Sequence, residues 1–171
     1  MSNDFEIIYR EAQPSDASEL LLHLSRVGGE SDFLTFGKEG FGTSAEREAR
    51  FIARFIKNSD ELMLVATVAD TVVANGVIER ERIPRLSHRA RLSLTVLKEY
   101  SHRGIGTRLL EMMIDFARES GAEIIYLECH VDNTRAVSLY EKFGFIISGR
   151  MKKYFKIDGK YHDAYLMELA L

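Results

Sequence analysis

The sequence of 171 residues is poor in features that mark several classes of protein. Its single cysteine, Cys129, excludes an internal disulfide framework and is compatible with a reducing compartment. Two prolines and 12 glycines are too few for a collagen-like or linker-rich chain. No apolar run approaches the roughly 18 residues that a membrane-spanning helix needs. The N-terminal segment has no basic region followed by an apolar block, so we expect no secretory signal and a cytoplasmic location.

An excess of one charge is also missing. The chain has 23 lysines and arginines against 26 aspartates and glutamates, which gives a net charge of −3. Nucleic-acid binding usually needs a basic domain or a basic stripe. The nearest candidate is the arginine-rich stretch 80–91, which is interrupted by Glu81 and is typical of a solvated hairpin or loop. We therefore expect no nucleic-acid partner and no membrane partner, although a local role beside a phosphorylated ligand stays open.

Apolar residues are plentiful and suit one hydrophobic core. They make up 46% of the chain, and aromatic residues make up 10%, which argues against disorder. A domain typically has about 100–200 residues, so we expect residues 1–171 to form a single domain.

Hydrophobic periodicity and turn residues predict a mixed α/β fold with the order β-α-α-β-β-β-α-β-α-β-β. The expected strands cover residues 5–10, 62–68, 71–80, 90–97, 123–130, 151–157 and 161–169. The first helix is expected to start at Pro14 and to end at Gly28-Gly29, and residues 30–42 read as irregular. A Thr43-x-x-Glu46 capping box predicts the start of the second helix. The third helix begins at Gly104, and Asp132 or Asn133 can cap the fourth.

The glycines at the start of the third helix predict a site for an anion. The segment Gly104-Ile105-Gly106-Thr107 follows a strand and opens a helix, so backbone N–H groups and the helix dipole favour negative charge there. A dinucleotide fingerprint would require glycine where this chain has Leu109, and no Gly-Lys-Ser/Thr sequence of a Walker A loop is present. The spacing alone is also compatible with a merely tight connection.

Two linked motifs resemble those of the GNAT superfamily of N-acetyltransferases. The stretch 94–107, Leu-Thr-Val-Leu-Lys-Glu-Tyr-Ser-His-Arg-Gly-Ile-Gly-Thr, is similar to its acetyl-CoA-binding motif, Gln/Arg-x-x-Gly-x-Gly/Ala. A second segment, Asn133-x-x-Ala136-x-x-Leu139-Tyr140-x-x-x-Gly144-Phe145, resembles the second signature of the family and lies at the appropriate distance downstream. With the element order, the resemblance covers essentially the whole chain. The chain departs from the acetyl-CoA-binding motif at one position, Ser101, where the family has Gln or Arg.

The resemblance implies a GNAT fold in which two central parallel strands splay apart around acetyl-CoA. The strand residues Leu94, Thr95 and Val96 would bond the pantetheine arm through their backbone. Asn133 would contact this arm, and the small Ala136 would leave room for it. Tyr140 would lie beside the cofactor. The residues expected to cradle the pyrophosphate are Ser101, His102, Arg103, Gly104, Ile105, Gly106 and Thr107.

The implied reaction is the direct attack of an amine on the thioester. Asn133, Ala136 and Tyr140 share one helical face, which places Tyr140 as the proton donor to the leaving thiolate. The alternative for Tyr140 is an ordinary core residue. Glu128 is the leading candidate for the base, because its stretch resembles that of RimI-type ribosomal-protein N-acetyltransferases. It could also be an exposed strand glutamate. In that case Glu79 or a chain of waters would relay the proton.

Cys129 and His130 are adjacent on a strand, so they point to opposite faces and cannot pair as nucleophile and base. No His-Glu-x-x-His or similar spacing is present, and we expect no metal site.

The acceptor pocket is expected at residues 28–42, because the corresponding segment usually forms a wall of this pocket in the family. The carboxylates of Glu30 and Asp32 beside Phe33 would suit a cationic amine, either a small molecule or a protein N-terminal or lysine amine. A solvated loop is the alternative.

The main alternative function is a non-catalytic module that binds CoA as a sensor or scaffold, which is favoured by Ser101 and by the absence of a glutamate near Ala90. The resemblance also leaves a homodimer open.

Overall fold

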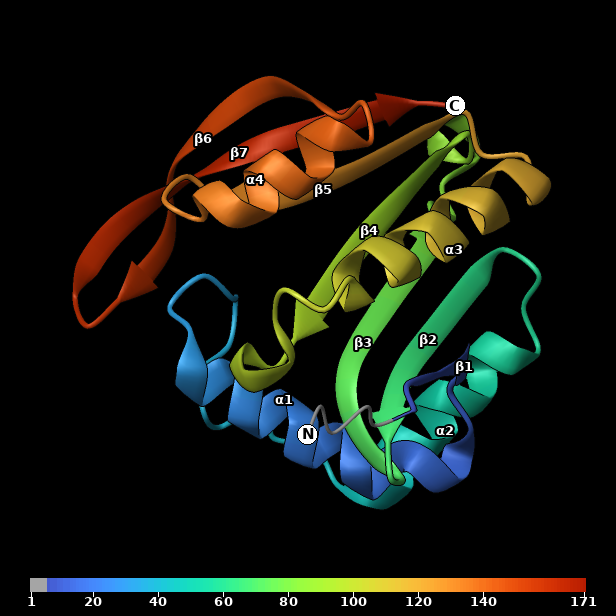
Figure 1. The fold of residues 1–171 in the computed structure, drawn as a ribbon. Helices are drawn as coiled ribbons and strands as arrows, with labels where there is room; N and C mark the ends of the chain where they lie inside the picture. The colour runs from blue at the N-terminus through green and yellow to red at the C-terminus, as the bar shows by residue number, and fades with distance from the viewer. Residues whose placement is uncertain (1–5) are drawn as a thin grey trace.

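The computed structural model describes residues 6–171, and its elements follow the predicted order (Figure 1). The strands are β1 (Ile8–Glu11), β2 (Glu61–Val68), β3 (Thr71–Arg80), β4 (Arg89–Val96), β5 (Ile124–His130), β6 (Ile146–Ile157) and β7 (Lys160–Ala170). The α-helices are α1 (Ala17–Glu30), α2 (Ala45–Ile56), α3 (Ile105–Glu119) and α4 (Thr134–Lys142). Phe5, the first residue of the predicted opening strand, lies outside the described residues. None of the helices in the described part of the chain has the length and apolarity that a membrane crossing requires.

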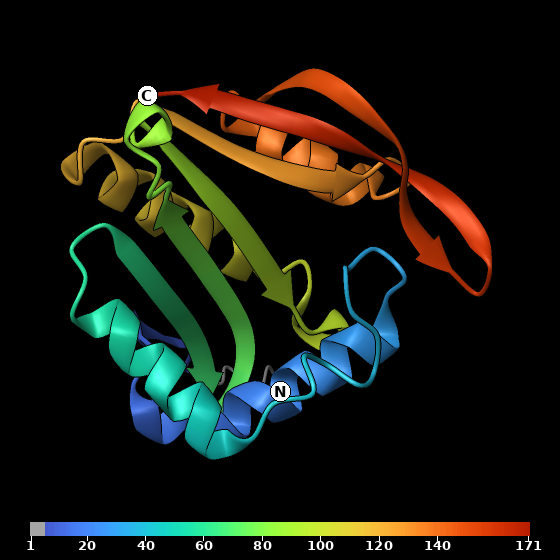
Figure 2. The same ribbon diagram turned by 180° about the vertical axis from the view of Figure 1, so that it is seen from behind.

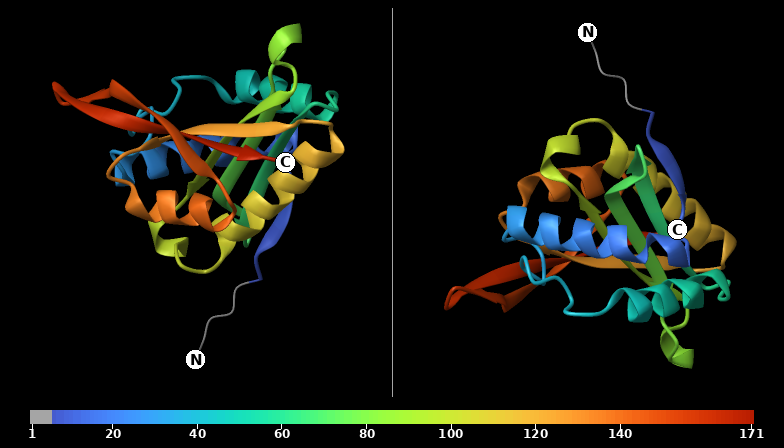
Figure 3. Two further views of the ribbon diagram at one scale, coloured as in Figure 1. Left: turned by 90° about the horizontal axis from the view of Figure 1, so that it is seen from above. Right: turned by 90° about the horizontal axis from the view of Figure 1, so that it is seen from below.

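The strands form one sheet in the order β1-β2-β3-β4-β5-β7-β6, between two layers of helices. Helices α1 and α2 cover one face of the sheet (Figure 2). Helix α3 packs on the opposite face against β2, β3 and β4, and α4 lies on the same side as α3 (Figures 1 and 3). This arrangement buries one apolar cluster between the sheet and α3 and a second one under α1 and α2.

The two central strands run parallel and then separate. The ladder between β4 and β5 covers only three pairs, from Arg89↔Ile124 to Arg91↔Tyr126, whereas the neighbouring strand pairs are antiparallel. Beyond these pairs the strands diverge toward their C-terminal ends (Figure 1). The predicted splay of two central parallel strands is confirmed. It leaves backbone N–H and C=O groups on the facing edges available to a ligand.

The end predicted for the first helix is wrong, because α1 continues through Gly28 and Gly29 to Glu30. The glycine at position 28 is needed for close packing instead. A Cβ atom there would lie 2.1 Å from the carbonyl oxygen of Gly37. The predicted cap of the second helix is displaced by one residue, since the side chain of Ser44 accepts the N–H of Arg47 at 3.3 Å. The tertiary contacts of the 31–44 segment thus override the local end signal.

Candidate active site

The N-terminus of α3 presents unsatisfied backbone donors. Gly104 adopts the left-handed conformation, with φ of 76°, and no side chain caps the helix. The first bond into this turn runs from the N–H of Arg108 to the carbonyl of Gly104, at 2.9 Å. The N–H groups of Ile105, Gly106 and Thr107 therefore precede the hydrogen-bonded part of the helix, where an anion would be bound.

Gly106 leaves space at this helix end that the protein itself does not require. A Cβ atom there would lie 3.6 to 3.7 Å from side-chain atoms of Leu94, Val96 and Leu139, which is ordinary contact. The absent side chain therefore relieves no internal clash, but it lets a ligand approach the backbone closely. Free N–H groups, a small residue and the separated strands together fit the pyrophosphate and the arm of acetyl-CoA.

A cavity of about 690 Å³ opens beside β4 and β5, and residues of α1, α2 and α4 contribute to its lining. It brings together many of the residues that the sequence singled out: Leu94, Thr95, Glu128, Asn133, Ala136, Tyr140, Phe33 and the reserve base Glu79. Val96, residues 101–107, Glu30 and Asp32 lie outside its lining.

Tyr140 is buried, with 7% of its surface exposed, and it lines the cavity from α4. Its ring packs against Phe145 at 5.5 Å between centroids. Burial, reinforced by the neighbouring Cys129, raises the pKa of the Tyr140 hydroxyl well above its ordinary value of 10.0. This hydroxyl has no hydrogen-bond partner among residues 6–171. Tyr140 is therefore fully protonated at neutral pH and can donate a proton within the cavity.

Glu128 is held by an arginine that sequence reasoning did not select. Arg91 on β4 places Nε and Nη2 at 3.1 and 2.9 Å from the same oxygen, Oε2. The Glu128 side chain is 19% exposed, and both residues line the cavity. The second oxygen of Glu128 remains available to a substrate proton. Arg91 follows Ala90 on β4, the stretch in which the sequence has no glutamate to act as a base.

Glu79 also lines the cavity, from β3, directly opposite Arg91 in the strand register. Its carboxylate accepts a hydrogen bond from Arg54 at 2.7 Å, and its side chain is 39% exposed. The reserve base is thus paired with an arginine, as Glu128 is.

Asn133 caps α4, as the sequence predicted. Its Oδ1 accepts the N–H of Ala136 at 3.2 Å, which orients the first turn of the helix. This cap holds Asn133, Ala136 and Tyr140 on the cavity side of α4.

The predicted acceptor residues are distributed over different places. Glu30 accepts the backbone N–H of Lys98 at 2.9 Å, so its carboxylate ties the end of α1 to the segment after β4. Phe33 lines the cavity and packs against His130, with ring centroids 5.0 Å apart.

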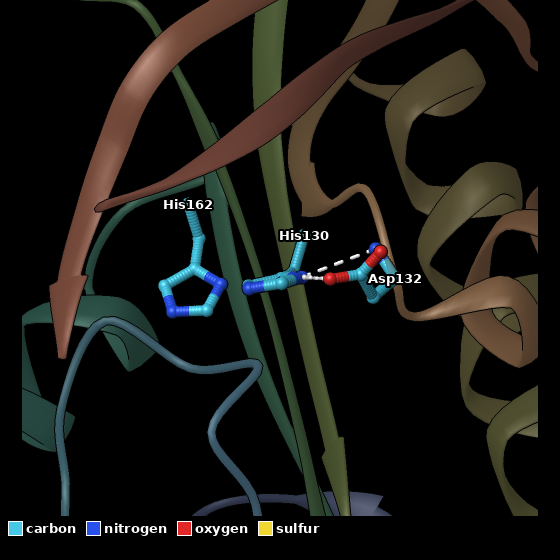
Figure 4. Close-up of side chains that lie close together, drawn as sticks. All are labelled: His130, Asp132 and His162. Carbon is cyan, nitrogen blue, oxygen red and sulfur yellow. Dashed lines mark hydrogen bonds and ion pairs between the residues drawn. The ribbon is translucent and has the colours of Figure 1, made fainter. Parts of the chain in front are cut away.

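His130, Asp132 and His162 form a cluster (Figure 4), and His130 also lines the cavity. Their potential ligand atoms lie within 4.8 Å of one another. Nδ1 of His130 accepts the N–H of Asp132 at 3.1 Å, which keeps the proton of the neutral ring on Nε2. With this hydrogen bond in place the ring offers no lone pair toward His162, so the donor set does not suit a metal as it is arranged.

Cys129 belongs to the larger apolar cluster and also lines the cavity, and burial raises the pKa of its thiol to about 11. The thiol is therefore not activated as a nucleophile.

Sequence reasoning missed Glu48 on α2, which also lines the cavity. A signal for it existed, because Glu48, Ile52 and Phe55 follow the helical spacing of a buried stripe.

Comparison with known proteins gives a consistent result. Residues 30–145 match the acetyltransferase (GNAT) family. The L-amino acid N-acetyltransferase AaaT of Escherichia coli is 36% identical over 105 residues, which are 61% of this chain and 65% of AaaT. The N-alpha-acetyltransferase of Sulfurisphaera tokodaii is 33% identical over 130 residues, 71% of this chain and 76% of that protein. The match to the N-alpha-acetyltransferase RimI of Mycobacterium tuberculosis, at 43% identity, spans 40% of each chain.

Solved structures agree with this assignment. A GNAT-family acetyltransferase from Streptococcus pneumoniae superposes with a TM-score of 0.93 at 32% identity, over 97% of this chain and all of that one (100%). YncA of Salmonella typhimurium, solved with acetyl-CoA, shares the fold with a TM-score of 0.85 at 16% identity, over 97% of this chain and 94% of YncA. The chain belongs to the acetyltransferase (GNAT) family.

Proposed function

We propose that the protein is an acyltransferase that moves the acetyl group of acetyl-CoA to an amine by direct attack. The observation that carries this proposal is the way in which β4 connects a free strand edge, the cavity and the start of α3. Its edge is free beyond Arg91, its residues Leu94 and Thr95 wall the cavity, and the chain then leads to the uncapped N-terminus of α3. The names of the relatives support the same activity.

Acetyl-CoA would supply the reactive thioester. Residues 94–96 would bond its pantetheine arm through their backbone, and residues 101–107 would hold its pyrophosphate. Ser101 in place of Gln or Arg shortens one side chain, but the N–H groups of the turn supply most of the anion binding. Asn133 would contact the arm, and Ala136 would leave space for it.

The chain's own residues would move two protons. Glu128 would take a proton from the amine, directly or through water, so that the nitrogen can form its bond to the acetyl carbon. As the bond between carbon and sulfur breaks, Tyr140 would give its proton to the sulfur. The Arg91 ion pair would fix the orientation of Glu128 and leave one oxygen free.

The acceptor is proposed to be a small-molecule amine or the amine of a peptide. Relatives named for L-amino acids and for N-alpha-acetylation represent both classes. Of the three acceptor residues predicted from the sequence, Phe33 is the one in the cavity wall, so it carries this part of the proposal.

The test is a screen of acceptors that detects release of the free thiol, with polyamines, amino acids, aminoglycosides and peptides. We expect thiol release with at least one class, and a product whose mass increases by one acetyl group. Binding of acetyl-CoA in calorimetry without thiol release from any acceptor would contradict the proposal. It would support the alternative of a CoA-binding sensor or scaffold.

We further propose that the protein acts in the cytoplasm, without nucleic acid, and as a homodimer. The balanced charge and the single buried cysteine support the first two points. For the dimer, the edge strand β6 exposes Ile146 and Ile147, at 65% and 44%. Sedimentation velocity measures the assembly directly.

A further inference from the structure

A buried carboxylate faces the cavity from α2. Glu48 is 7% exposed, and it shares the buried stripe of the helix with Ile52 and Phe55, which are 0% and 4% exposed. Its side chain contributes to the lining of the cavity that holds Glu128 and Tyr140. A charged group thus occupies a position that the helix otherwise fills with apolar side chains.

This carboxylate has no counter-ion within residues 6–171, and it accepts no side-chain or backbone hydrogen bond there. Burial alone raises the pKa of Glu48. Glu61 on β2, which is 3% exposed, is paired instead, because Arg54 and Arg82 approach it to 3.1 and 2.5 Å. Glu79 is also paired with Arg54. Arginines thus pair with Glu61 and Glu79, whereas Glu48 has no such partner among residues 6–171, so its carboxylate can accept a cationic ligand in the cavity.

Aromatic rings accompany Glu48 in the same wall. Phe36 and Phe41 line the cavity with ring centroids 4.6 Å apart, and Phe41 is 61% exposed. A carboxylate gives a charge-assisted hydrogen bond to an ammonium group, and aromatic faces attract the same cation. The cavity lining, which also contains Arg47 and Arg91, thus supplies groups that can bind an organic cation.

We propose that Glu48 binds a second positive charge on the acceptor, away from the amine that is acetylated. This inference rests on the proposed function, since a nitrogen that attacks a thioester must be neutral and cannot remain the cation that Glu48 pairs with. The preferred acceptor is accordingly a dication, such as a diamine or an amine that carries a basic side chain. Glu48 is then a residue that determines specificity and takes no part in proton transfer.

The test compares acceptors that differ only in the second charge. Calorimetry on the CoA-saturated protein is expected to give diaminobutane a Kd about 10- to 100-fold lower than that of butylamine. In Glu48→Gln the preference is lost, because the amide keeps the shape and removes the charge. Glu48→Asp keeps the charge and is expected to retain part of the preference.

The matched control is Glu46→Gln, which removes the same charge from the exposed side of the same helix turn. It is expected to leave the preference unchanged. A preference that persists in Glu48→Gln, or that falls equally in Glu46→Gln, would overturn the proposal.

A second pair of acceptors, alanyl-lysine amide and alanyl-norleucine amide, distinguishes a peptide source of the second charge from a small diamine. A preference for the lysine peptide that depends on Glu48 supports the proposal with a peptide acceptor, and no such preference in either pair overturns it. Because binding is measured without turnover, failure of this inference can be distinguished from failure of the proposed function. Binding that depends on Glu48 without thiol release would refute the transferase proposal alone.

Discussion

Tyr140 offers the cavity a hydroxyl that stays protonated because burial raises its pKa. Replacing Tyr140 by Phe removes this proton and little else, since the hydroxyl has no hydrogen-bond partner among the described residues. We expect kcat to fall by about 100-fold, within the usual range for general acid catalysis. Steady-state kinetics with an acceptor from the screen measure this change, and the Kd of acetyl-CoA should not move. A variant with wild-type kcat would show that Tyr140 is only a packing residue.

Glu128 is tested through the pH dependence of turnover. In Glu128→Gln the amide cannot accept the proton of the amine, so kcat/KM should fall and its pH profile should change shape. The exposed Glu123, just before β5, provides the control variant Glu123→Gln with the same change in charge. Superimposable profiles for wild type and Glu128→Gln would leave Glu79 or a water chain as the proton acceptor.

His23 links folding to pH. It is 1% exposed, its Nε2 lies 2.8 Å from the hydroxyl of Thr95, and burial lowers its pKa from 6.5 to about 4. The unfolded chain therefore binds a proton that the folded chain does not. The stability is fully present above pH 6.5 and is lost as the pH falls toward 4.

The lowered pKa corresponds to a loss of about 3 kcal/mol in the free energy of unfolding. Urea denaturation at a series of pH values measures it. Other groups also titrate in this interval, so His23→Gln is the reference, and its stability should decline less steeply over the same range. Equal slopes for the two proteins would show that His23 does not supply this pH dependence.

Substitutions at the two adjacent glycines near the end of α1 can distinguish the effect of helix propensity from that of packing. A Cβ atom at Gly28 would lie 2.1 Å from the carbonyl oxygen of Gly37, whereas at Gly29 the nearest atom is Cβ of Lys38, at 3.6 Å. We expect Gly28→Ala to destabilise the protein by about 1–3 kcal/mol, because the 31–44 segment must move away from the helix.

The variant Gly29→Ala is the matched control, and it is expected to stabilise the helix by up to about 1 kcal/mol. Thermal denaturation of both variants gives the comparison. Gly28→Ala should also weaken acceptor binding, since the displaced segment carries Phe33 and Phe36 of the cavity wall. Equal stability of the two variants would contradict the close packing of α1 on this segment.

Local patterns were sufficient to predict the order of the elements. Runs rich in β-branched residues predicted β2 and β3 and the turn between them, where Ala69 and Asp70 take positive φ values of 45° and 65°. Helical spacing placed Asn133, Ala136 and Tyr140 on one face of α4, and all three line the cavity. These features depend on neighbours in the sequence.

The features that were missed depend on contacts between distant segments. Glycine is required at position 28 by the close approach of the Gly37 backbone, and the Arg91–Glu128 ion pair depends on the register of two strands that α3 separates in the chain. Glu48 has a charged side chain on an apolar stripe, so its burial becomes interpretable only once the cavity beside it is known. Most of the residues predicted to lie beside the cofactor arm line the cavity, whereas Phe33 is the one predicted acceptor residue that does so.

The two parts of the molecule meet at a short ladder. Residues up to β4 and the unit from β5 to β7 share one sheet through only three β4–β5 residue pairs, and the gap beyond them is where the cofactor is proposed to bind. A ligand that bridges this gap should stabilise the fold as a whole. With acetyl-CoA at 100 times its Kd, we expect about 2.7 kcal/mol of added stability and a Tm higher by about 5–10 °C.

A single substitution can distinguish the stabilisation that bound acetyl-CoA provides from the intrinsic stability of α3. Thr107→Asp places a carboxylate in the first turn of the helix, where the dipole favours it, so the protein without ligand should gain about 0.3–1 kcal/mol. The same carboxylate would repel the pyrophosphate at the free N–H groups, and the rise of Tm with acetyl-CoA should largely disappear. Differential scanning calorimetry with and without acetyl-CoA measures both effects. If the variant kept the full rise, the cofactor phosphates would have to lie away from this helix end, and the stabilisation would come from another part of the molecule.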